Sequence, residues 1–239
     1  MRATLGVLSK MIVTHHDPGA IASEAYRVLR TNLQFLGLDE PLRTMLVTSA
    51  TPGEGKSTTV ANLAVAFAQT GARVCLVDAD LRRPTVAKLF GLDNWSGLTT
   101  ALIGQAPLTE CLRPTDVPGL SVMTSGPIPP NPAELLGSAR MSTLLGQLTD
   151  SFDMVLVDSP PVLAVTDAAV LAPKVGGVLM VVRSGNVDHR QVTRAKEAIE
   201  AVKAKVLGVV LSAVQPEGRD GYYYYYYHSE EPSAGRSKR

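Results

Sequence analysis

A glycine-rich stretch at residues 50–58, ATPGEGKST, has the spacing of a Walker A phosphate-binding loop, with alanine in place of its first glycine. Two of its glycines allow backbone N–H groups to turn towards a phosphate, and its lysine can reach the outer phosphates of a nucleotide. The serine hydroxyl stands where such loops ligate magnesium, at the positive end of a helix. A tight turn without a ligand is the alternative, but loop, lysine and hydroxyl all favour a phosphate site made of Pro52, Gly53, Glu54, Gly55, Lys56, Ser57 and Thr58.

Three aspartates stand where carboxylates could organise a metal beside this loop. Asp78 and Asp80 follow the apolar run RVCLV, and Asp158 ends the run DMVLV. Magnesium keeps several of its waters and uses few protein ligands, so a small set of carboxylates suffices. Capping of the following helices is the alternative role for the same side chains.

These residues must be positioned by elements that bring the ends of several strands together. Short, almost continuously apolar runs alternate with helical patterns, which is typical of a parallel sheet covered on both faces. We therefore predict an α/β fold, a P-loop NTPase-like doubly wound and mostly parallel sheet. The predicted strands are 44–49, 73–78, 120–124, 153–158, 177–183 and 206–211, and the predicted helices are 20–38, 57–70, 133–148 and 187–202.

The predicted domain boundaries follow from the same patterns. Residues 1–19 show no periodicity and are predicted to be an N-terminal linker, and residues 20–215 are predicted to form one P-loop domain. Residues 216–239 carry charges and turn formers without aliphatic side chains, so we predict a disordered, tyrosine-rich tail. No apolar run reaches about 18 residues and no leader-like segment begins the sequence, so we expect neither a membrane span nor an export signal in it.

The overall composition gives little indication of a partner. The 239 residues include 23 Lys and Arg against 22 Asp and Glu, so nothing global favours nucleic acid, and we expect none to bind. The two cysteines, Cys75 and Cys111, form no disulfide framework or metal-binding spacing, which fits a reducing cytoplasm.

Six of the seven tyrosines stand side by side near the C-terminal end of the sequence, a distribution that core packing does not require. Such a run could be a stacking patch for a partner. Beside a predicted nucleotide site, phosphorylation is the favoured interpretation, and the predicted sites are Tyr222, Tyr223, Tyr224, Tyr225, Tyr226 and Tyr227.

Together these motifs resemble the bacterial tyrosine autokinases of capsule and exopolysaccharide assembly, the BY-kinases. The likeness runs over about residues 20–214 and rests on the Walker A loop, on VDADLRRP at residues 77–84, on PNPAELL at 130–136, on VLVDSPP at 155–161 and on the tyrosine run. It implies an ATP- and Mg²⁺-dependent kinase with a fold like that of the MinD and ParA ATPases. In that family Lys56 and the loop amides would hold ATP, and Ser57, Asp80 and Asp158 would organise the metal. The resemblance gives Lys56, Asp78 and Asp80 as the catalytic residues: Asp78 would accept the tyrosine proton or orient the hydroxyl, and the division of roles between Asp78 and Asp80 stays open.

The resemblance also implies partners. Glu24, Arg27 and Arg30 match an ExxRxxR pattern through which family members assemble, so the resemblance implies self-association, with a ring as the expected form. The alternative is a solvated helix face with an internal Glu24–Arg27 pair. A transmembrane activator is implied, either as a separate protein or as a missing N-terminal part of a longer chain, and so is a cognate phosphotyrosine phosphatase. The protein is then expected in the cytoplasm, held at the inner face of the cell membrane through this activator.

The sequence departs from related folds at one position. Where MinD-like proteins often place an asparagine that reads adenine, this chain has Leu211, Ser212 and Ala213, so the residue that recognises the base stays open. The main alternative function is a MinD- or ParA-type ATPase switch cycling between monomer and dimer on a membrane or DNA, but the signature lysine at the start of the loop and a C-terminal amphipathic helix are both missing. An iron–sulfur carrier of this fold needs a CxxC pair, which is absent.

Overall fold

The computed structural model describes residues 10–36, 41–185 and 188–215. Within these ranges seven strands form one sheet in the order β3-β4-β2-β5-β1-β6-β7. All neighbouring pairs are parallel except β3 and β4, which are antiparallel. The strands are β1 (Thr44–Ser49), β2 (Val74–Asp78), β3 (Leu112–Pro114), β4 (Leu120–Met123), β5 (Met154–Asp158), β6 (Val178–Arg183) and β7 (Val206–Ser212).

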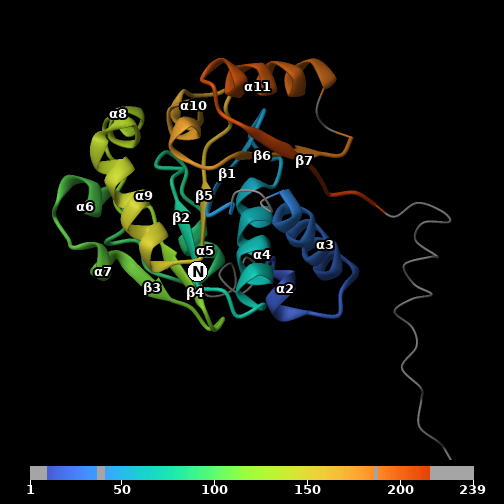
Figure 1. The fold of residues 1–239 in the computed structure, drawn as a ribbon, viewed down its shortest axis with the longest axis horizontal. Coiled ribbons are helices and arrows are strands. Elements are labelled where there is room, and N and C mark those ends of the chain that lie inside the picture. Colours follow the sequence, from blue (N-terminus) through green and yellow to red (C-terminus); the bar gives the residue numbers. More distant parts are fainter. Residues whose placement is uncertain (1–9, 37–40, 186–187, 216–239) are drawn as a thin grey trace, which may run out of the picture.

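Helices cover both faces of the sheet, as Figure 1 shows. One core joins the sheet to α2 (Val13–His16), α3 (Ile21–Leu36), α4 (Lys56–Ala68) and α5 (Val86–Leu89). The other core holds α6 (Leu98–Ile103), α7 (Leu108–Cys111), α8 (Pro132–Gly137), α9 (Ala139–Ser151), α10 (Asp167–Leu171), the 3₁₀ turn η1 (Ala172–Lys174) and α11 (His189–Ala201). Successive residues of β1 divide between the two cores: Leu46 enters the second, and Met45 and Val47 enter the first. The continuous apolar runs are therefore explained by burial on two faces.

The parallel order brings the carboxyl ends of β1, β2, β5, β6 and β7 to one edge of the sheet. Asp78 at the end of β2 is in register with Asp158 at the end of β5. The loop that follows β1 leads into α4 at this same edge. The predicted fold class is confirmed, and the topology places the predicted phosphate loop beside two of the three predicted carboxylates.

Several parts of the fold differ from the prediction. The helix predicted at 133–148 is two helices, α8 and α9, because Ser138 between them has extended backbone angles (φ −62°, ψ 157°) and its hydroxyl accepts a hydrogen bond from the Met141 N–H. The strand β7 is not buried on both faces, since it lies at the edge of the sheet and leaves Val209 and Leu211 more than half exposed. The short antiparallel strand β3 was not predicted.

Residues 10–19, part of the predicted linker, contain the short helix α2 and pack against α4. Ile12 and Thr14 are buried, and the Thr14 hydroxyl donates to the side-chain oxygen of Asn62 at 3.0 Å. The exact domain boundaries stay a prediction. Among the described helices, none is both long enough and apolar enough to cross a bilayer.

Candidate active site

The phosphate loop is shaped by two positions whose backbone conformation only glycine adopts easily. Gly53 and Gly55 have φ of +83° and +89°, in the left-handed region that side chains disfavour. Gly55 is the N-cap of α4, and no side chain caps that end of the helix. The first amides of α4 are therefore directed at open space, where the helix dipole favours an anion.

Lys56 supplies a cation that forms no ion pair within the described residues. Its side chain is largely buried, with 8% of the residue exposed, and no carboxylate in the described ranges forms an ion pair with it. Together with Ser57 it lines a cavity of about 860 Å³. That volume is within the range of small-molecule sites. A buried and unpaired ammonium beside free helix amides makes this an anion site.

The side chain of Glu54 holds the predicted phosphate loop in place. The side chain is buried, and one carboxylate oxygen accepts hydrogen bonds from the Thr51 N–H (2.5 Å) and hydroxyl (2.9 Å), while the other accepts from the Arg183 N–H at 3.3 Å. Its carbonyl oxygen accepts from the Ser212 hydroxyl at 2.6 Å. Glu54 thus fastens the loop to β6 and β7, and its carboxylate does not face the cavity.

Asp158 is a buried carboxylate without a protein partner. Both of its oxygens are buried and lack a hydrogen bond to any described residue. Burial raises the pKa of Asp158 to about 7, although the nearby Ser57 hydroxyl and Lys56 ammonium favour the charged form. Such a group needs a cation or ordered water.

Asp78 is also fully buried, but its oxygens are occupied. One accepts from the Asp80 N–H at 3.2 Å, and the other accepts from the Thr85 and Val86 N–H groups at 3.2 and 3.0 Å. Burial, and then the charge of Asp158, raise the pKa of Asp78 well above its usual range. Asp78 holds the loop that leads into α5, so the capping role left open from the sequence is present here.

Asp80 lines the cavity, and its carboxylate also orders the loop after β2. One oxygen accepts from the Arg82 and Arg83 N–H groups at 3.3 and 2.9 Å. The Arg82 guanidinium makes two hydrogen bonds, of 2.8 and 2.9 Å, to the buried carboxylate of Asp167. Asp167 was not found from the sequence, because its partner lies far away along the chain.

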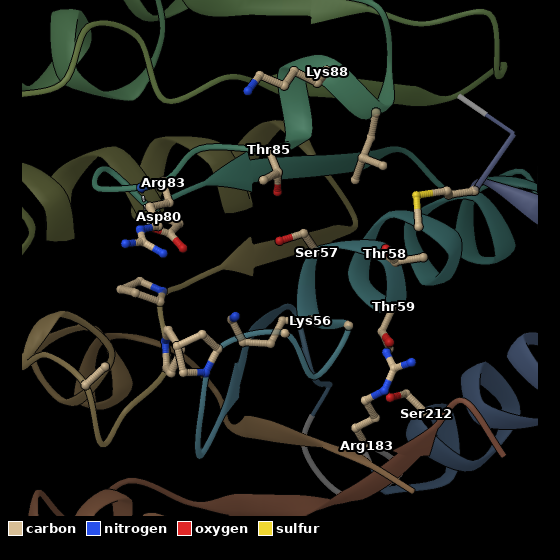
Figure 2. A pocket seen from close by; sticks show the side chains of 18 of the residues that line it. Lys56, Ser57, Thr58, Thr59, Asp80, Arg83, Thr85, Lys88, Arg183 and Ser212 are labelled. Atoms are coloured by element: carbon tan, nitrogen blue, oxygen red, sulfur yellow. Dashed lines mark hydrogen bonds between the residues drawn. The ribbon is translucent and has the colours of Figure 1, made fainter. Parts of the chain in front are cut away.

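The cavity extends from the phosphate loop in two directions (Figure 2). Asp80, Thr85 and Lys88 lie beyond Ser57 on one side, and Arg183 and Ser212 lie on the other. Ser212 therefore lies beside the loop. It belongs to the segment in which MinD-like proteins often have the asparagine that reads adenine. Arg183 was not predicted, and only its place at the end of a strand could have indicated it.

The predicted interface strip lies on α3 but makes contacts within the chain. The Arg27 guanidinium pairs with Glu24 at 2.7 Å and also donates to the Pro18 carbonyl, as the internal-pair alternative expected. Arg30 donates to the Ala66 carbonyl of α4 at 3.0 Å. All three residues remain partly exposed, so both functions are compatible with the geometry. The predicted phosphorylation sites at 222–227 lie outside the described residues.

The donor set fits a magnesium–nucleotide complex. The unpartnered oxygens of Asp158 lie close to the Ser57 hydroxyl, next to an uncapped helix N-terminus. Hard oxygen donors of this kind suit Mg²⁺ when phosphate and water complete its shell. In the part of the chain that the structure describes, no three His, Cys, Asp or Glu side chains form a closed metal cage.

Comparison with known proteins begins with the family model. The ParA model, described as NUBPL iron-transfer P-loop NTPase, matches residues 42–219, well over half of the chain. MinD of Pyrococcus horikoshii shares the fold, with a TM-score of 0.61 at 22% identity. These matches confirm the P-loop NTPase architecture.

More similar relatives are tyrosine kinases. Tyrosine-protein kinase YwqD of Bacillus subtilis is 44% identical over 205 residues, which are 86% of each chain. The solved kinase domain of Escherichia coli tyrosine kinase Etk has a TM-score of 0.81 at 35% identity and covers 87% of this chain and 83% of that one. The complete Etk protein of strain K12 is longer: the match at 37% identity spans 86% of this chain and 28% of Etk. The resemblance seen in the motifs is confirmed, and the chain belongs to the ParA family of P-loop NTPases and, within it, to the bacterial tyrosine-protein kinases.

Proposed function

We propose that this kinase transfers the terminal phosphoryl group of ATP to tyrosines 222–227 of its own C-terminal segment. The observation that carries this proposal is the end of β7. This strand runs parallel to its neighbour and finishes at Ser212, whose hydroxyl donates to the Glu54 carbonyl of the phosphate loop. The chain therefore leaves the domain at the site itself. Ten positions separate Ser212 from Tyr222, and they span at most about 33–36 Å.

The proposed roles in binding follow the geometry. Lys56 and the first amides of α4 hold the phosphates, with Gly53 and Gly55 allowing the loop to close on them. Ser57, Asp80 and Asp158 hold Mg²⁺ directly or through water. The metal, when bound, neutralises charge on the phosphates.

The transfer itself exchanges one bond for another. The bond between the terminal phosphorus and the bridging oxygen of ATP breaks, a bond from that phosphorus to the phenolic oxygen forms, and the phenolic proton leaves. Asp78 remains our proposed acceptor or orienting group for that proton. A direct contact with a phenol requires Asp78 to exchange some of its three backbone hydrogen bonds, and Asp80, which lines the cavity, is the more accessible carboxylate.

The test is incubation of the purified chain with Mg²⁺ and ATP, followed by mass spectrometry of the C-terminal peptide. Phosphate on tyrosines 222–227 is expected for the wild type and not for Lys56→Met. Release of inorganic phosphate with an unmodified peptide, even with an activator present, would support an ATPase switch instead.

Asp78→Asn should slow phosphorylation while nucleotide binding is kept; a wild-type rate would remove Asp78 from the mechanism.

The cellular role is proposed from the relatives. We propose that the kinase regulates the assembly and export of a capsular or exopolysaccharide chain. It would act at the inner face of the membrane, with a transmembrane activator and an opposing phosphotyrosine phosphatase. The match to a short part of the much longer Etk supports an activator portion that can be fused or separate.

Self-association is proposed through Glu24, Arg27 and Arg30 on α3. These residues are partly exposed, so their internal pairs can exchange for contacts with a second copy. Light scattering of the unphosphorylated protein at high concentration is the test. A ring-sized species is expected for the wild type and a monomer for Arg27→Ala/Arg30→Ala; a monomeric wild type would contradict the ring.

A further inference from the structure

Two cations at one end of the active-site cavity have no assigned partner. Arg83 and Lys88 are exposed, line the cavity and form no ion pair with any carboxylate in the described ranges. The neighbouring Arg82 differs, because Asp167 neutralises it. We call Arg83 and Lys88 the cationic lip.

The lip lies on a loop whose backbone is hydrogen-bonded to the carboxylates of Asp78 and Asp80. Asp80 accepts hydrogen bonds from the Arg83 N–H, and Asp78 accepts from the N–H groups of Thr85 and Val86, where α5 begins. Lys88 follows on α5, whose apolar residues are buried in the core. The two cations therefore project from a backbone that is already ordered, so only their side chains have to be ordered when they bind an anion.

The lip lies on the Asp80 side of the phosphate loop. In Figure 2, Lys88 and Thr85 lie on the far side of Ser57 from Arg183 and Ser212. If the nucleotide phosphates occupy the anion site at Lys56, a tyrosine side chain must approach from one of these two sides. The side next to Asp80 carries two cations without an ion pair in the described ranges, Arg83 and Lys88, whereas the other side carries one, Arg183.

We propose that the cationic lip is a phosphotyrosine subsite, which holds a tail tyrosine that is already phosphorylated while a neighbouring tyrosine is modified. The proposal rests on the proposed autophosphorylation. A phosphotyrosine carries about −1.5 to −2 charges and three acceptor oxygens, which suit recognition by an arginine and a lysine.

The spacing of the tail favours phosphotyrosine over the carboxylates that flank the run. Asp220 and Glu230 lie outside tyrosines 222–227, so residues in the middle of the run are several positions from either. A phosphate on a neighbouring tyrosine is always one or two residues away. In an extended segment, side chains two residues apart point the same way at about 6.5–7 Å. Only a tail that already carries a phosphotyrosine can place the same kind of anion at the same spacing from each tyrosine that is modified next.

A binding measurement tests the subsite without activity. Two synthetic peptides of residues 218–231, one unmodified and one phosphorylated on Tyr225, are titrated against the dephosphorylated full-length chain with Mg²⁺ and ADP. The phosphopeptide is expected to bind roughly tenfold more tightly, as charge-assisted pairing implies. Arg83→Ala/Lys88→Ala should lose most of this preference.

The matched control is Arg190→Ala/Arg194→Ala, which removes two exposed cations from α11, away from the cavity, that form no ion pair in the described ranges. It should keep the preference. Equal binding of both peptides to the wild type, or a preference that survives in the lip variant, would overturn the subsite. If the double variant no longer binds ADP, Arg83→Gln and Lys88→Gln are compared singly, and each should lose part of the preference.

A time course separates this inference from the proposed function. Intact-mass spectrometry with Mg²⁺ and ATP should show multiply phosphorylated wild-type chains while unmodified chains remain. The lip variant should instead accumulate singly phosphorylated chains, and the α11 control should resemble the wild type. If the lip variant has the same ratio of multiply to singly phosphorylated chains as the wild type, the proposed role of the first phosphotyrosine in later phosphorylation is wrong. A wild type without any tail phosphate overturns the proposed autophosphorylation, and the peptide preference still decides the subsite.

Discussion

At the residue scale, the phosphate loop depends on a side chain that does not face the ligand cavity. Glu54 accepts hydrogen bonds from Thr51 on one side of the loop and from the Arg183 N–H on the next strand. Two glycines make the loop adaptable, and this carboxylate fixes which of its shapes is populated. Buried acceptors that hold several N–H groups are costly to remove, because the donors lose their only partners.

Glu54→Ala is therefore expected to weaken nucleotide binding. The loop amides lose their fixed direction, and we expect a loss of tenfold or more in affinity for a fluorescent ATP analogue, which is about 1.4 kcal/mol. The free energy of unfolding should fall by about 1–3 kcal/mol. Thr51→Val, which removes only the hydroxyl contact, is the milder control. Wild-type affinity in Glu54→Ala would show that the loop keeps its shape without this acceptor.

Asp158 gives a prediction for pH. Its pKa is raised to about 7 by burial, against about 3.9 in an unfolded chain. Between these values the folded state binds more protons than the unfolded state, so this group makes stability fall as pH rises from about 4 to 7. Asp158→Asn removes the charge and should raise the free energy of unfolding at pH 8 by about 1–3 kcal/mol without metal or nucleotide.

Urea denaturation at pH 5 and pH 8 measures this effect. The control is Asp153→Asn, because Arg73 lowers the pKa of Asp153 to about 2 and its titration ends below pH 5. That variant should keep the wild-type dependence on pH between 5 and 8. If the free energy of unfolding changes between pH 5 and pH 8 by the same amount in Asp158→Asn as in the wild type, Asp158 is charged in the folded protein throughout this range.

Sequence reasoning at this scale found the residues whose roles are local and missed those whose partners are distant. Walker A spacing located Gly55, Lys56 and Ser57 because the turn and the helix that follows it are contiguous. The hydrogen bond from Arg183 to Glu54 and the pair of Arg82 with Asp167 join residues that only the assembled sheet brings together. No spacing rule contains that information.

At the element scale, apolar runs predicted the strands well but not their surroundings. The run of β7 resembles that of a central strand, yet β7 pairs on one side only. The predicted helix at 133–148 contained its own break signal, since Gly137 and Ser138 are typical of a C-terminus and an N-cap. The helix α2 has too few residues for a periodic pattern, and its position is fixed by polar contacts with α4.

Asn62 makes most of those contacts and provides an element-scale test. Its side-chain oxygen accepts from the Thr14 N–H and hydroxyl, and its amide donates to the Met11 and Thr58 carbonyls. Asn62→Ala should lower the free energy of unfolding by about 2–3 kcal/mol, since buried donors lose their acceptor.

Hydrogen exchange followed by mass spectrometry localises that effect. Peptides covering residues 10–19 should exchange faster in Asn62→Ala, because the segment is released from α4 before the domain unfolds. Gln69→Ala, which loses only a hydrogen bond to the Thr14 carbonyl, should show a smaller change. Exchange at the wild-type rate in Asn62→Ala would mean that apolar packing of Ile12 is sufficient.

At the scale of the whole molecule, one edge of the sheet gathers the strand ends that carry the phosphate loop, the buried carboxylates and the exit of the chain. This arrangement follows from a parallel sheet, in which every carboxyl end faces the same way. The formal net charge is only +1 before any modification. Phosphates added to a segment that begins at this edge therefore dominate the electrostatics of the molecule.

Phosphorylation of the tail is for this reason expected to weaken self-association. Filling most of six adjacent tyrosines adds roughly −9 to −12 charges, far more than the two cations of the lip can neutralise. Copies held side by side would each carry this charge, and their repulsion is screened over about 8 Å at physiological ionic strength. Light scattering before and after incubation with Mg²⁺ and ATP should show smaller species after phosphorylation, and high salt should partly restore the larger ones. A chain with phenylalanine at positions 222–227 is the control, since it binds the nucleotide but gains no tail charge. Equal populations before and after complete phosphorylation would show that the tail charge lies too far from the contacts between copies to oppose them.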